Sequence, residues 1–480
     1  CPPMKLLELL LPDCLALAPS SSAQAPAATD LGARIEAIRE EAGIPALGGA
    51  LVTLDGLQGV WVTGTRRAGG EEQVTPDDQW HLGSCTKSMT ATLIALLVAR
   101  GDLAWDTPLG ELMPDIAGEM DVDYADITLV ELLCHRGGLP ANPSPAVFTA
   151  GEKLGLVEQR EQLMRAIFGQ APHHPPRGAL LYSNTGFLIA GHIAERVTKK
   201  PWETLMQELL FTPLGMASAG FGPPGSSAVC DQPRGHTEAG EALEPGPEAD
   251  NPPIIGPAGT VHASLADWAK YVQLHLAGAR GDVKVGALTL TRDTFTRLHT
   301  PYDGPKEKYG FGWVFEKRPW AGGDGTAFWH NGSNTMWYCV TWLGPGNGVA
   351  ALVTGTVEGR LTRGRSWLLP SSRAADRLIE RLDALTPAAR ARLNRPGLSP
   401  QPAPPPDVTF SEHGLGSAVE ASLGVLGLRY DTEDLMGVRR DARTGERTFA
   451  VRRRNEATAT LSLFAGQGGR VSGRVEQRYA

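Results

Sequence analysis

The spacing of hydrophobic residues changes twice along the first 385 residues of the chain. Over residues 29–42, apolar positions recur every three or four residues, which predicts an amphipathic helix with one buried face. Two short strands are predicted next, at 47–53 and 59–63, because Asp55-Gly56 between them is typical of a tight turn. We therefore expect a helix followed by a β-hairpin.

A second helix is expected to begin at Ser84 and to end at Gly101, and apolar residues fall on nearly all of its faces. Such a helix is buried inside a protein rather than lying on its surface. The region 102–255 combines helical patterns with many prolines and glycines, which predicts a mostly helical lobe. Beyond Pro301 the pattern indicates strands again, at 309–314, 327–330, 336–343 and 349–354.

Strands at both ends of the first 385 residues thus flank a helical middle. This order predicts an α+β fold for residues 29–386, in which both ends build one antiparallel sheet and a cleft separates the sheet from the helical lobe. A hairpin turn at 344–348 joins the last two strands, and a helix at 371–385 is placed to pack on the sheet. A stiff Pro-rich linker, 387–408, then leads to a small β-rich unit, 409–480.

Composition and charge narrow the range of functions. Hydrophobic residues make up 42% of the 480 residues, as in ordinary globular proteins, and the net charge of −8 without a long basic run argues against a nucleic-acid partner. No stretch of about 18 uncharged apolar residues occurs, so no transmembrane segment is expected. The cysteines lack the CxxC spacing of zinc and redox sites, and we predict neither a metal nor a cofactor.

Residues 1–28 are interpreted as a leader. Lys5 precedes an apolar run, and the small-residue stretch 23–25 follows it, which is the order of a secretory signal. Glu8 and Pro12 interrupt the apolar run and argue against this interpretation. On balance the segment favours export, to the periplasm or out of the cell.

Ser84 and Lys87 form a Ser-x-x-Lys motif at the start of the predicted buried helix. Residues three apart share a helix face, so the lysine amine can reach the serine oxygen and help to remove its proton. The helix N-terminus favours the negative charge that develops. A capping serine with a solvated lysine is the alternative, and the motif alone does not exclude it.

Tyr182 and Asn184 form a second motif, Tyr-x-Asn, in the predicted helical lobe. A tyrosine acidified by nearby cations can accept or relay a proton, and the asparagine amide can hold Lys87 and a substrate carbonyl. The alternative is a surface turn, because Ser-Asn-Thr-Gly is also good turn composition.

A third segment, His330-Asn331-Gly332, follows the strand that contains Trp329. Gly332 allows a substrate backbone to approach closely, and the strand edge can bind it by β-addition. His330 can donate to a substrate carboxylate or assist proton transfer. A strand-end histidine before a tight turn is the simpler alternative.

In this order and spacing, the three motifs resemble the signature of the serine β-lactamase and penicillin-binding protein superfamily. The resemblance is to the class C β-lactamase branch, with its DD-carboxypeptidases, D-aminopeptidases and esterases. It covers roughly residues 30–385, and implies a β-lactamase/transpeptidase-like fold. The blocks that carry it include WHLGSCTKSMTATLIALLVARGDLAWDTPL, ITLVELLCHRGGLP, LLYSNTGFLIAGHIAERVT and GPAGTVHASLADWAKYV.

The resemblance implies a role for each motif residue. Ser84 is expected to form an acyl-enzyme, Lys87 and Tyr182 to share the role of general base, and Asn184 to orient Lys87 and the substrate. The backbone N–H groups of Ser84 and Ser333 are expected to form an oxyanion hole. The implied activity is cofactor-free hydrolysis of amide or ester bonds in a small molecule or peptide: D-Ala peptides, β-lactams or short esters.

The chain departs from class C β-lactamases at His330-Asn331-Gly332, where those enzymes carry Lys-Thr-Gly. A histidine there is similar to the carboxypeptidase, D-aminopeptidase and esterase relatives, and favours ester over lactam turnover. A true class C β-lactamase is one alternative. A non-catalytic peptidoglycan sensor is another, although a binding module has no need of Ser84, Lys87 and Tyr182 together.

Other polar residues have simpler interpretations. His173 and His174 lie among prolines and are expected in an exposed loop rather than at a metal. His135 is interpreted as loop scaffolding, and His262 either borders the cleft or is structural. Cys85 is interpreted as part of the core, with Ser84 as the better nucleophile.

Overall fold

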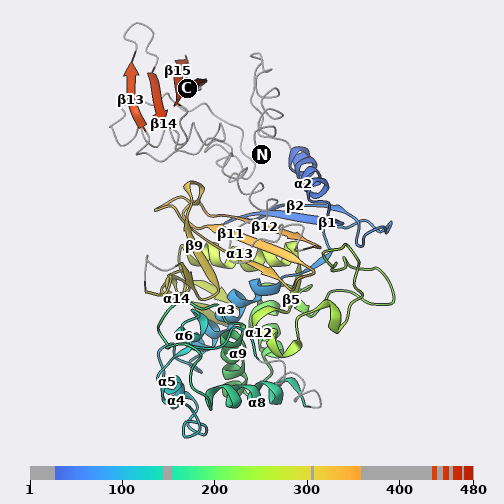
Figure 1. The fold of residues 1–480 in the computed structure, drawn as a ribbon, viewed down its shortest axis with the longest axis vertical. Coiled ribbons are helices and arrows are strands. Elements are labelled where there is room, and N and C mark those ends of the chain that lie inside the picture. Colours follow the sequence, from blue (N-terminus) through green and yellow to red (C-terminus); the bar gives the residue numbers. More distant parts are fainter. Residues whose placement is uncertain are drawn as a thin grey trace.

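The computed structural model describes residues 28–143, 154–303 and 308–357, and the backbone of four strands between 435 and 478. A seven-stranded antiparallel sheet lies above a helical lobe (Figure 1). From edge to edge its strands are β2 (Gly56–Gly64), β1 (Ala46–Thr53), β12 (Val349–Gly355), β11 (Tyr338–Gly344), β10 (Thr326–Ser333), β9 (Trp313–Lys317) and β8 (Tyr309–Gly310). The predicted α+β fold, with one sheet built from both ends of the domain, is confirmed.

The two ends of the domain meet in the sheet where β1 pairs with β12. This pairing is antiparallel and places Leu47 opposite Gly355. Both predicted hairpins are present, since Thr53 faces Gly56 across the first turn and Gly344 faces Val349 across the second. Segments about 300 residues apart in sequence therefore share one ladder of hydrogen bonds.

The central strands of the sheet, from β1 to β10, are buried on both faces. Helix α2 (Ala28–Ala42) packs against β1 and β2 on one face, and α13 (Leu265–Gly278) packs on the other (Figure 1). Side chains alternate along a strand, so Phe328 of β10 joins the core beneath α13, whereas Trp329 joins the core beneath α2.

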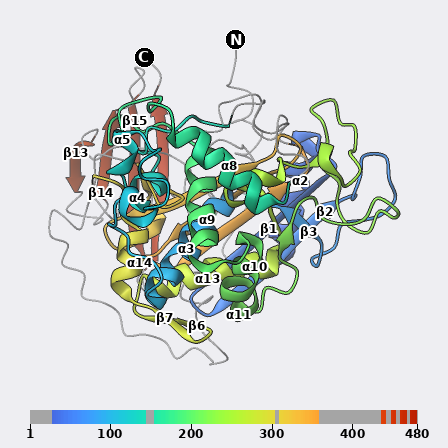
Figure 2. The ribbon, with the colours of Figure 1, turned by 90° about the horizontal axis from the view of Figure 1, so that it is seen from below.

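Helix α3 (Thr86–Arg100) passes through the middle of the molecule. Its residues from Thr86 to Leu97 are all buried, as the apolar pattern predicted. The helix ends at Gly101, whose φ of +88° is a left-handed conformation that glycine adopts without strain. Figure 2 shows α3 and α9 together at the centre of the lobe.

The helical lobe is confirmed as far as residue 214. Its helices are α4 (Leu109–Leu112), α5 (Val122–Ala125), α6 (Leu129–Leu133), α8 (Leu156–Phe168), α9 (Asn184–Thr198), α10 (Trp202–Met206) and α11 (Thr212–Leu214). The last part of the predicted lobe, 215–255, is not helical, because it holds the short strand β4 (Gly220–Phe221), turns and 3-10 segments. Its many prolines and glycines do not sustain a helix.

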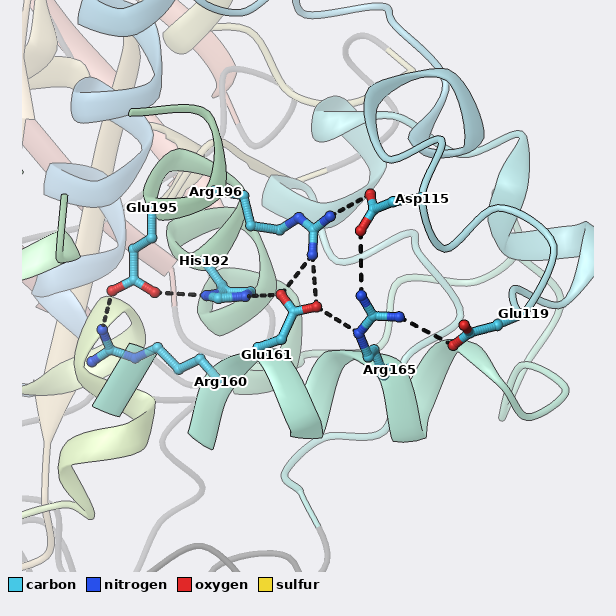
Figure 3. Close-up of polar contacts among 8 residues, drawn as sticks. All are labelled: Asp115, Glu119, Arg160, Glu161, Arg165, His192, Glu195 and Arg196. Atoms are coloured by element: carbon cyan, nitrogen blue, oxygen red, sulfur yellow. Dashed lines mark hydrogen bonds and ion pairs between the residues drawn. The ribbon is translucent and has the colours of Figure 1, made fainter. Parts of the chain in front are cut away.

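A chain of ion pairs ties the helices of the lobe together (Figure 3). At its buried end, Arg160 of α8 bonds to Glu195 of α9 at 2.6 Å. His192 joins Glu195 to Glu161 at 2.6 and 2.8 Å. The exposed end continues through Arg196, Asp115, Arg165 and Glu119. These bonds hold α8 against α9, the helix that begins at Asn184.

The strand predicted at 309–314 is two strands instead of one. β8 and β9 form a hairpin in which Gly310 faces Trp313. The two residues of the turn, Phe311 and Gly312, have φ of +52° and +85°, as in a type I′ turn. The alternation of apolar residues concealed this reversal, which pairs β8 with β9 and lets the Tyr309 side chain reach His330 of β10.

The C-terminal unit contains a four-stranded antiparallel sheet, in agreement with the predicted β-rich character. Its strands, in spatial order, are β13 (Leu435–Arg440), β14 (Arg447–Arg452), β15 (Thr458–Gly466) and β16 (Arg470–Arg478). The predicted helix 371–385 and linker 387–408 lie outside the described residues, so the boundary between the domains stays a prediction. Within the described ranges, every helix is too short or too polar to cross a bilayer.

Candidate active site

Ser84 and Lys87 lie where a short turn enters the buried helix. Ser84 belongs to the 3-10 turn η2 (Gly83–Cys85), and Lys87 is the second residue of α3. The Lys87 amine nitrogen Nζ lies 2.9 Å from Ser84 Oγ. The lysine side chain is fully buried, so it is not the solvated residue of the alternative interpretation.

Three oxygen atoms surround Lys87 Nζ. Besides Ser84 Oγ, Asn184 Oδ1 lies at 2.7 Å and the carbonyl oxygen of Ala258 at 2.8 Å. Burial lowers the pKa of Lys87 well below its usual value, because the charged form loses its hydration. A neutral amine has two N–H groups and one lone pair. If Asn184 and Ala258 accept the two N–H groups, the lone pair faces the Ser84 hydroxyl.

Tyr182 lies against Lys87, with the centre of its ring 4.7 Å from Nζ. Burial raises the pKa of the phenol, and a hydrogen bond with Ser84 opposes that shift only in part. The acidified tyrosine that the sequence motif suggested is therefore not seen, because burial destabilises the phenolate more than the site stabilises it. Tyr182 stays protonated at neutral pH, and it can relay a proton but is not a resting base.

Asn184 is the first residue of α9, and its amide is held at both ends. Oδ1 accepts a hydrogen bond from Lys87, and Nδ2 donates to Asn142 Oδ1 at 2.7 Å. Ser183 caps the helix, since its hydroxyl accepts a hydrogen bond from the Gly186 N–H. The cap positions Asn184 at the helix N-terminus, beside the lysine.

His330 lies in β10 and is buried beside Tyr182 and Tyr309. Nδ1 donates to the backbone carbonyl of Asn331, and Nε2 accepts from the Tyr309 hydroxyl at 3.1 Å. Burial lowers the pKa of the imidazole to about 3, so the ring is neutral at physiological pH. Both ring nitrogens already have partners, so a bond to a substrate carboxylate requires one of them to be released.

Two glycines allow β10 to approach the Ser84 turn. A Cβ on Gly332 would lie 1.9 Å from the Leu82 carbonyl oxygen and 2.9 Å from Ser84 N. A Cβ on Gly83 would lie 2.3 Å from Ser333 N. Gly332 therefore allows the chain's own backbone to approach closely, whereas the sequence suggested that it admits a substrate backbone. The contact packs β10 against the Ser84 turn, and the two amides expected to form the oxyanion hole belong to these facing segments.

Three residues at the site were not identified from the sequence. Ala258, in α12 (Gly256–Gly259), contributes only its backbone carbonyl, a group that every residue carries. Asn142 holds Asn184 but stands in no recognisable motif. Tyr309 bonds to His330, and Gly310 and Gly312, before and within the hairpin turn next to it, were the available signal.

The remaining candidates lie elsewhere or are structural. His173 and His174 are exposed, as expected of a loop. His262 is largely buried and bonds to a backbone carbonyl. Cys85 is buried, with Sγ 3.5 Å from the free thiol of Cys339. Among the described residues, no group of three or more His, Cys, Asp or Glu side chains is arranged to hold a metal ion.

Known proteins share this sequence pattern. Residues 33–368 match the family model described as Beta-lactamase. Penicillin-binding protein 4 of Amycolatopsis lactamdurans is 29% identical over 330 residues, which cover 67% of this chain and 83% of that protein. The D-alanyl-D-alanine-carboxypeptidase/endopeptidase AmpH of Escherichia coli (strain K12) is 25% identical and covers 57% of this chain and 70% of that protein. Two fungal unguisins hydrolases match over only 46% and 36% of their own lengths.

Solved structures share the fold. The beta-lactamase from Sulfitobacter sp. EE-36 has a TM-score of 0.59 at 21% identity, over 75% of this chain and 100% of that chain. The family match extends from α2 to beyond β12, and so includes the whole sheet and the helical lobe. The chain therefore belongs to the beta-lactamase family of hydrolases, within the superfamily of serine β-lactamases and penicillin-binding proteins.

Proposed function

We propose that the chain is a serine hydrolase that forms an acyl-enzyme on Ser84 and hydrolyses amide or ester bonds of small substrates. The observation that carries the proposal is the environment of Lys87. Its amine is fully buried, has a depressed pKa, and lies 2.9 Å from the serine hydroxyl. A serine needs such a neighbouring base to become a nucleophile.

In the proposed mechanism, Ser84 Oγ attacks the substrate carbonyl while Lys87 Nζ takes the serine proton. Tyr182, which contacts both groups, passes that proton to the departing alcohol or amine. The Ser84 and Ser333 amides stabilise the negative charge on the carbonyl oxygen of the tetrahedral intermediate. Water then attacks the acyl-enzyme, the same groups carry its proton back to Ser84, and the acid is released.

His330 supports a preference for esters over β-lactams. Class C β-lactamases carry a lysine at this position, whose ammonium group can attract an anionic substrate. Here the imidazole is buried and neutral, and both of its nitrogens are bonded within the chain. A neutral ester loses nothing from this replacement, whereas a β-lactam or a peptide carboxylate loses a cationic partner. D-Ala peptides and β-lactams remain in the proposed range as slower substrates.

Covalent labelling tests the nucleophile. A serine-directed phosphonate and a fluorescent penicillin are expected to label the protein on Ser84, and Ser84→Ala is expected to abolish labelling. Ser88→Ala is the matched control, because its hydroxyl is buried on α3, one turn after Ser84, and bonds to the Cys85 carbonyl. Labelling that persists in Ser84→Ala would exclude Ser84 as the nucleophile.

A substrate panel tests the preference. Turnover of p-nitrophenyl butyrate is expected to exceed turnover of nitrocefin and of a D-Ala-D-Ala peptide. His330→Lys is expected to raise nitrocefin turnover relative to ester turnover. A strong preference of the wild-type protein for nitrocefin would indicate a true class C β-lactamase. It would contradict the proposal that His330 favours esters over β-lactams.

The same assay separates the enzyme from a peptidoglycan sensor. A sensor is expected to form the acyl-enzyme and not to release it, whereas the proposed hydrolase turns over many times. Steady release of p-nitrophenol well beyond one equivalent per protein supports the enzyme. A single burst without turnover supports the sensor.

Two further proposals concern the ends of the chain. Export rests on the leader-like residues 1–28, and cell fractionation with N-terminal sequencing of the product tests it. The unit 409–480 is proposed either to cover the active site or to mediate association. Truncation after Pro396 is expected to change turnover or oligomeric size, and a protein unchanged in both would exclude these roles.

A further inference from the structure

A buried histidine lies beside the Tyr-x-Asn motif. His135 follows α6, is 3% exposed, and has a φ of +60°. A residue other than glycine in this left-handed region is strained, and such strain persists only where the surrounding structure imposes it. The interpretation of His135 as loop scaffolding does not explain why a bulky side chain occupies such a position.

His135 holds the backbone on both sides of Tyr182. Its carbonyl oxygen accepts a hydrogen bond from the Leu181 N–H at 3.2 Å. Its ring nitrogen Nδ1 accepts a hydrogen bond from the Ser183 N–H at 3.1 Å. Because Nδ1 is an acceptor, the proton of the neutral imidazole resides on Nε2. One residue thus fixes the peptide groups that flank Tyr182.

The imidazole also packs against the tyrosine itself. The ring centres of His135 and Tyr182 are 4.3 Å apart, and those of His135 and Tyr309 are 4.4 Å apart. Tyr309 in turn bonds to His330. The histidine ring therefore contacts both tyrosines and restricts the directions in which the Tyr182 phenol can point.

The rest of the segment from His135 to Asn142 continues the same support. Ser183 Oγ donates to the Pro140 carbonyl at 2.6 Å, and the Asn184 N–H donates to the Ala141 carbonyl at 2.8 Å. Asn142 then bonds to the Asn184 side chain. The segment from His135 to Asn142 thus contacts the segment from Leu181 to Asn184 along its length. The contacts of His135 are the ones nearest to Tyr182.

We propose that His135 is a positioning residue, which holds the Tyr182 phenol against Ser84 and Lys87 and so sets the rate of proton transfer. The inference rests on the proposed role of Tyr182. His135 acts through the tyrosine and does not contact the substrate. Its loss therefore lowers the acylation rate constant and leaves substrate binding nearly unchanged.

Two substitutions separate the contributions of His135. His135→Gly removes the ring and the Nδ1 acceptor, and glycine adopts the left-handed backbone without strain. His135→Asn keeps an acceptor near the position of Nδ1 and tolerates a positive φ, but it lacks the ring. We expect His135→Gly to lower the acylation rate on the order of 10- to 100-fold, as misplacement of a reacting group does. His135→Asn is expected to lose less, and the exposed-loop control His173→Gly to lose nothing.

A double-mutant cycle with Tyr182→Phe tests whether His135 acts through the tyrosine. Acylation is followed by phosphonate labelling, and kcat and KM are measured with p-nitrophenyl butyrate. We expect His135→Gly to lower kcat with KM within about threefold, and to cost less than about twofold once Tyr182 is phenylalanine. Thermal unfolding of each variant monitors folding, and His135→Asn replaces His135→Gly in the cycle if the glycine variant does not fold.

Two outcomes would overturn the inference, and they are distinguishable. An equal loss in both backgrounds means that His135 only supports the fold, while the role of Tyr182 stands. Wild-type acylation in the single variant Tyr182→Phe means that Tyr182 relays no proton, and then the proposed mechanism and the inference fail together.

Discussion

Replacing Gly332 with alanine should disable the site without removing any functional side chain. The added Cβ would lie 1.9 Å from the Leu82 carbonyl oxygen, whereas real Cβ contacts essentially never fall below 3.0 Å. The obstructing atoms belong to the backbone on both sides, so no side chain can rotate away. β10 and the Ser84 turn must therefore separate by about 1 Å, which is the scale of misplacement that lowers catalysis about 100-fold.

That displacement would act on the proposed oxyanion hole. A donor is effective when its nitrogen lies about 2.7–3.1 Å from the oxyanion, so a shift of about 1 Å removes one of the two amides. The loss of one donor costs on the order of 10²–10³ in rate, or about 2.7–4 kcal/mol of transition-state stabilisation. The overpacking should also lower the free energy of unfolding by about 1–3 kcal/mol.

The assay compares the acylation rates of folded Gly332→Ala and wild-type protein, with thermal unfolding measured in parallel. Gly118→Ala is the control, because a Cβ on Gly118 meets no atom within 4 Å. Gly83→Ala is expected to behave like Gly332→Ala, since its Cβ would lie 2.3 Å from Ser333 N. If Gly332→Ala acylates within about threefold of wild type, the close contact between β10 and the Ser84 turn does not matter for catalysis.

Three further predictions concern ionisable side chains that are buried. Lys87 must be neutral to act as a base, and burial lowers its pKa. The acylation rate should therefore rise with pH with a midpoint well below pH 10.5, and Lys87→Arg should lack this rise. A midpoint near pH 10.5 would contradict the proposed role of the lysine. Burial lowers the pKa of His299 to about 3, so the unfolded state binds the extra proton below pH 6.5. His299 should contribute about 2 kcal/mol to the stability lost between pH 6.5 and 5 in urea unfolding, and the loss should be smaller by about that amount in His299→Gln; an equal loss in the two proteins would contradict this. Arg160→Met should cost about 3–5 kcal/mol because it leaves the buried Glu195 carboxylate without its guanidinium partner, whereas Arg165→Met at the exposed end of the network should cost below about 1 kcal/mol; equal losses would contradict this.

Local patterns predicted much of the fold. The buried helix was evident because apolar residues occur on all faces of α3, and Gly101 ended it where a left-handed cap was needed. The turn between β1 and β2 and the turn between β11 and β12 were evident from their glycines. The reversal at Phe311 and the irregular stretch 215–255 were missed, because apolar alternation continues through a two-residue turn, and because scattered helical patterns do not outweigh proline and glycine.

The chemical groups of the candidate site were evident from the sequence alone, because Ser84, Lys87, Tyr182 and Asn184 are side chains recognisable by type and spacing. The protonation states of these side chains were not evident from the sequence, because a pKa depends on burial, and burial is a property of the packed structure. Tertiary structure alone decided that Tyr182 remains a protonated phenol and that His330 is neutral. It also decided the contacts that the backbone makes: the Ala258 carbonyl on the lysine, the bonds of His135 around Tyr182, and the approach of β10 to Ser84. Every residue carries the same N–H and C=O groups, and only the fold determines where they point.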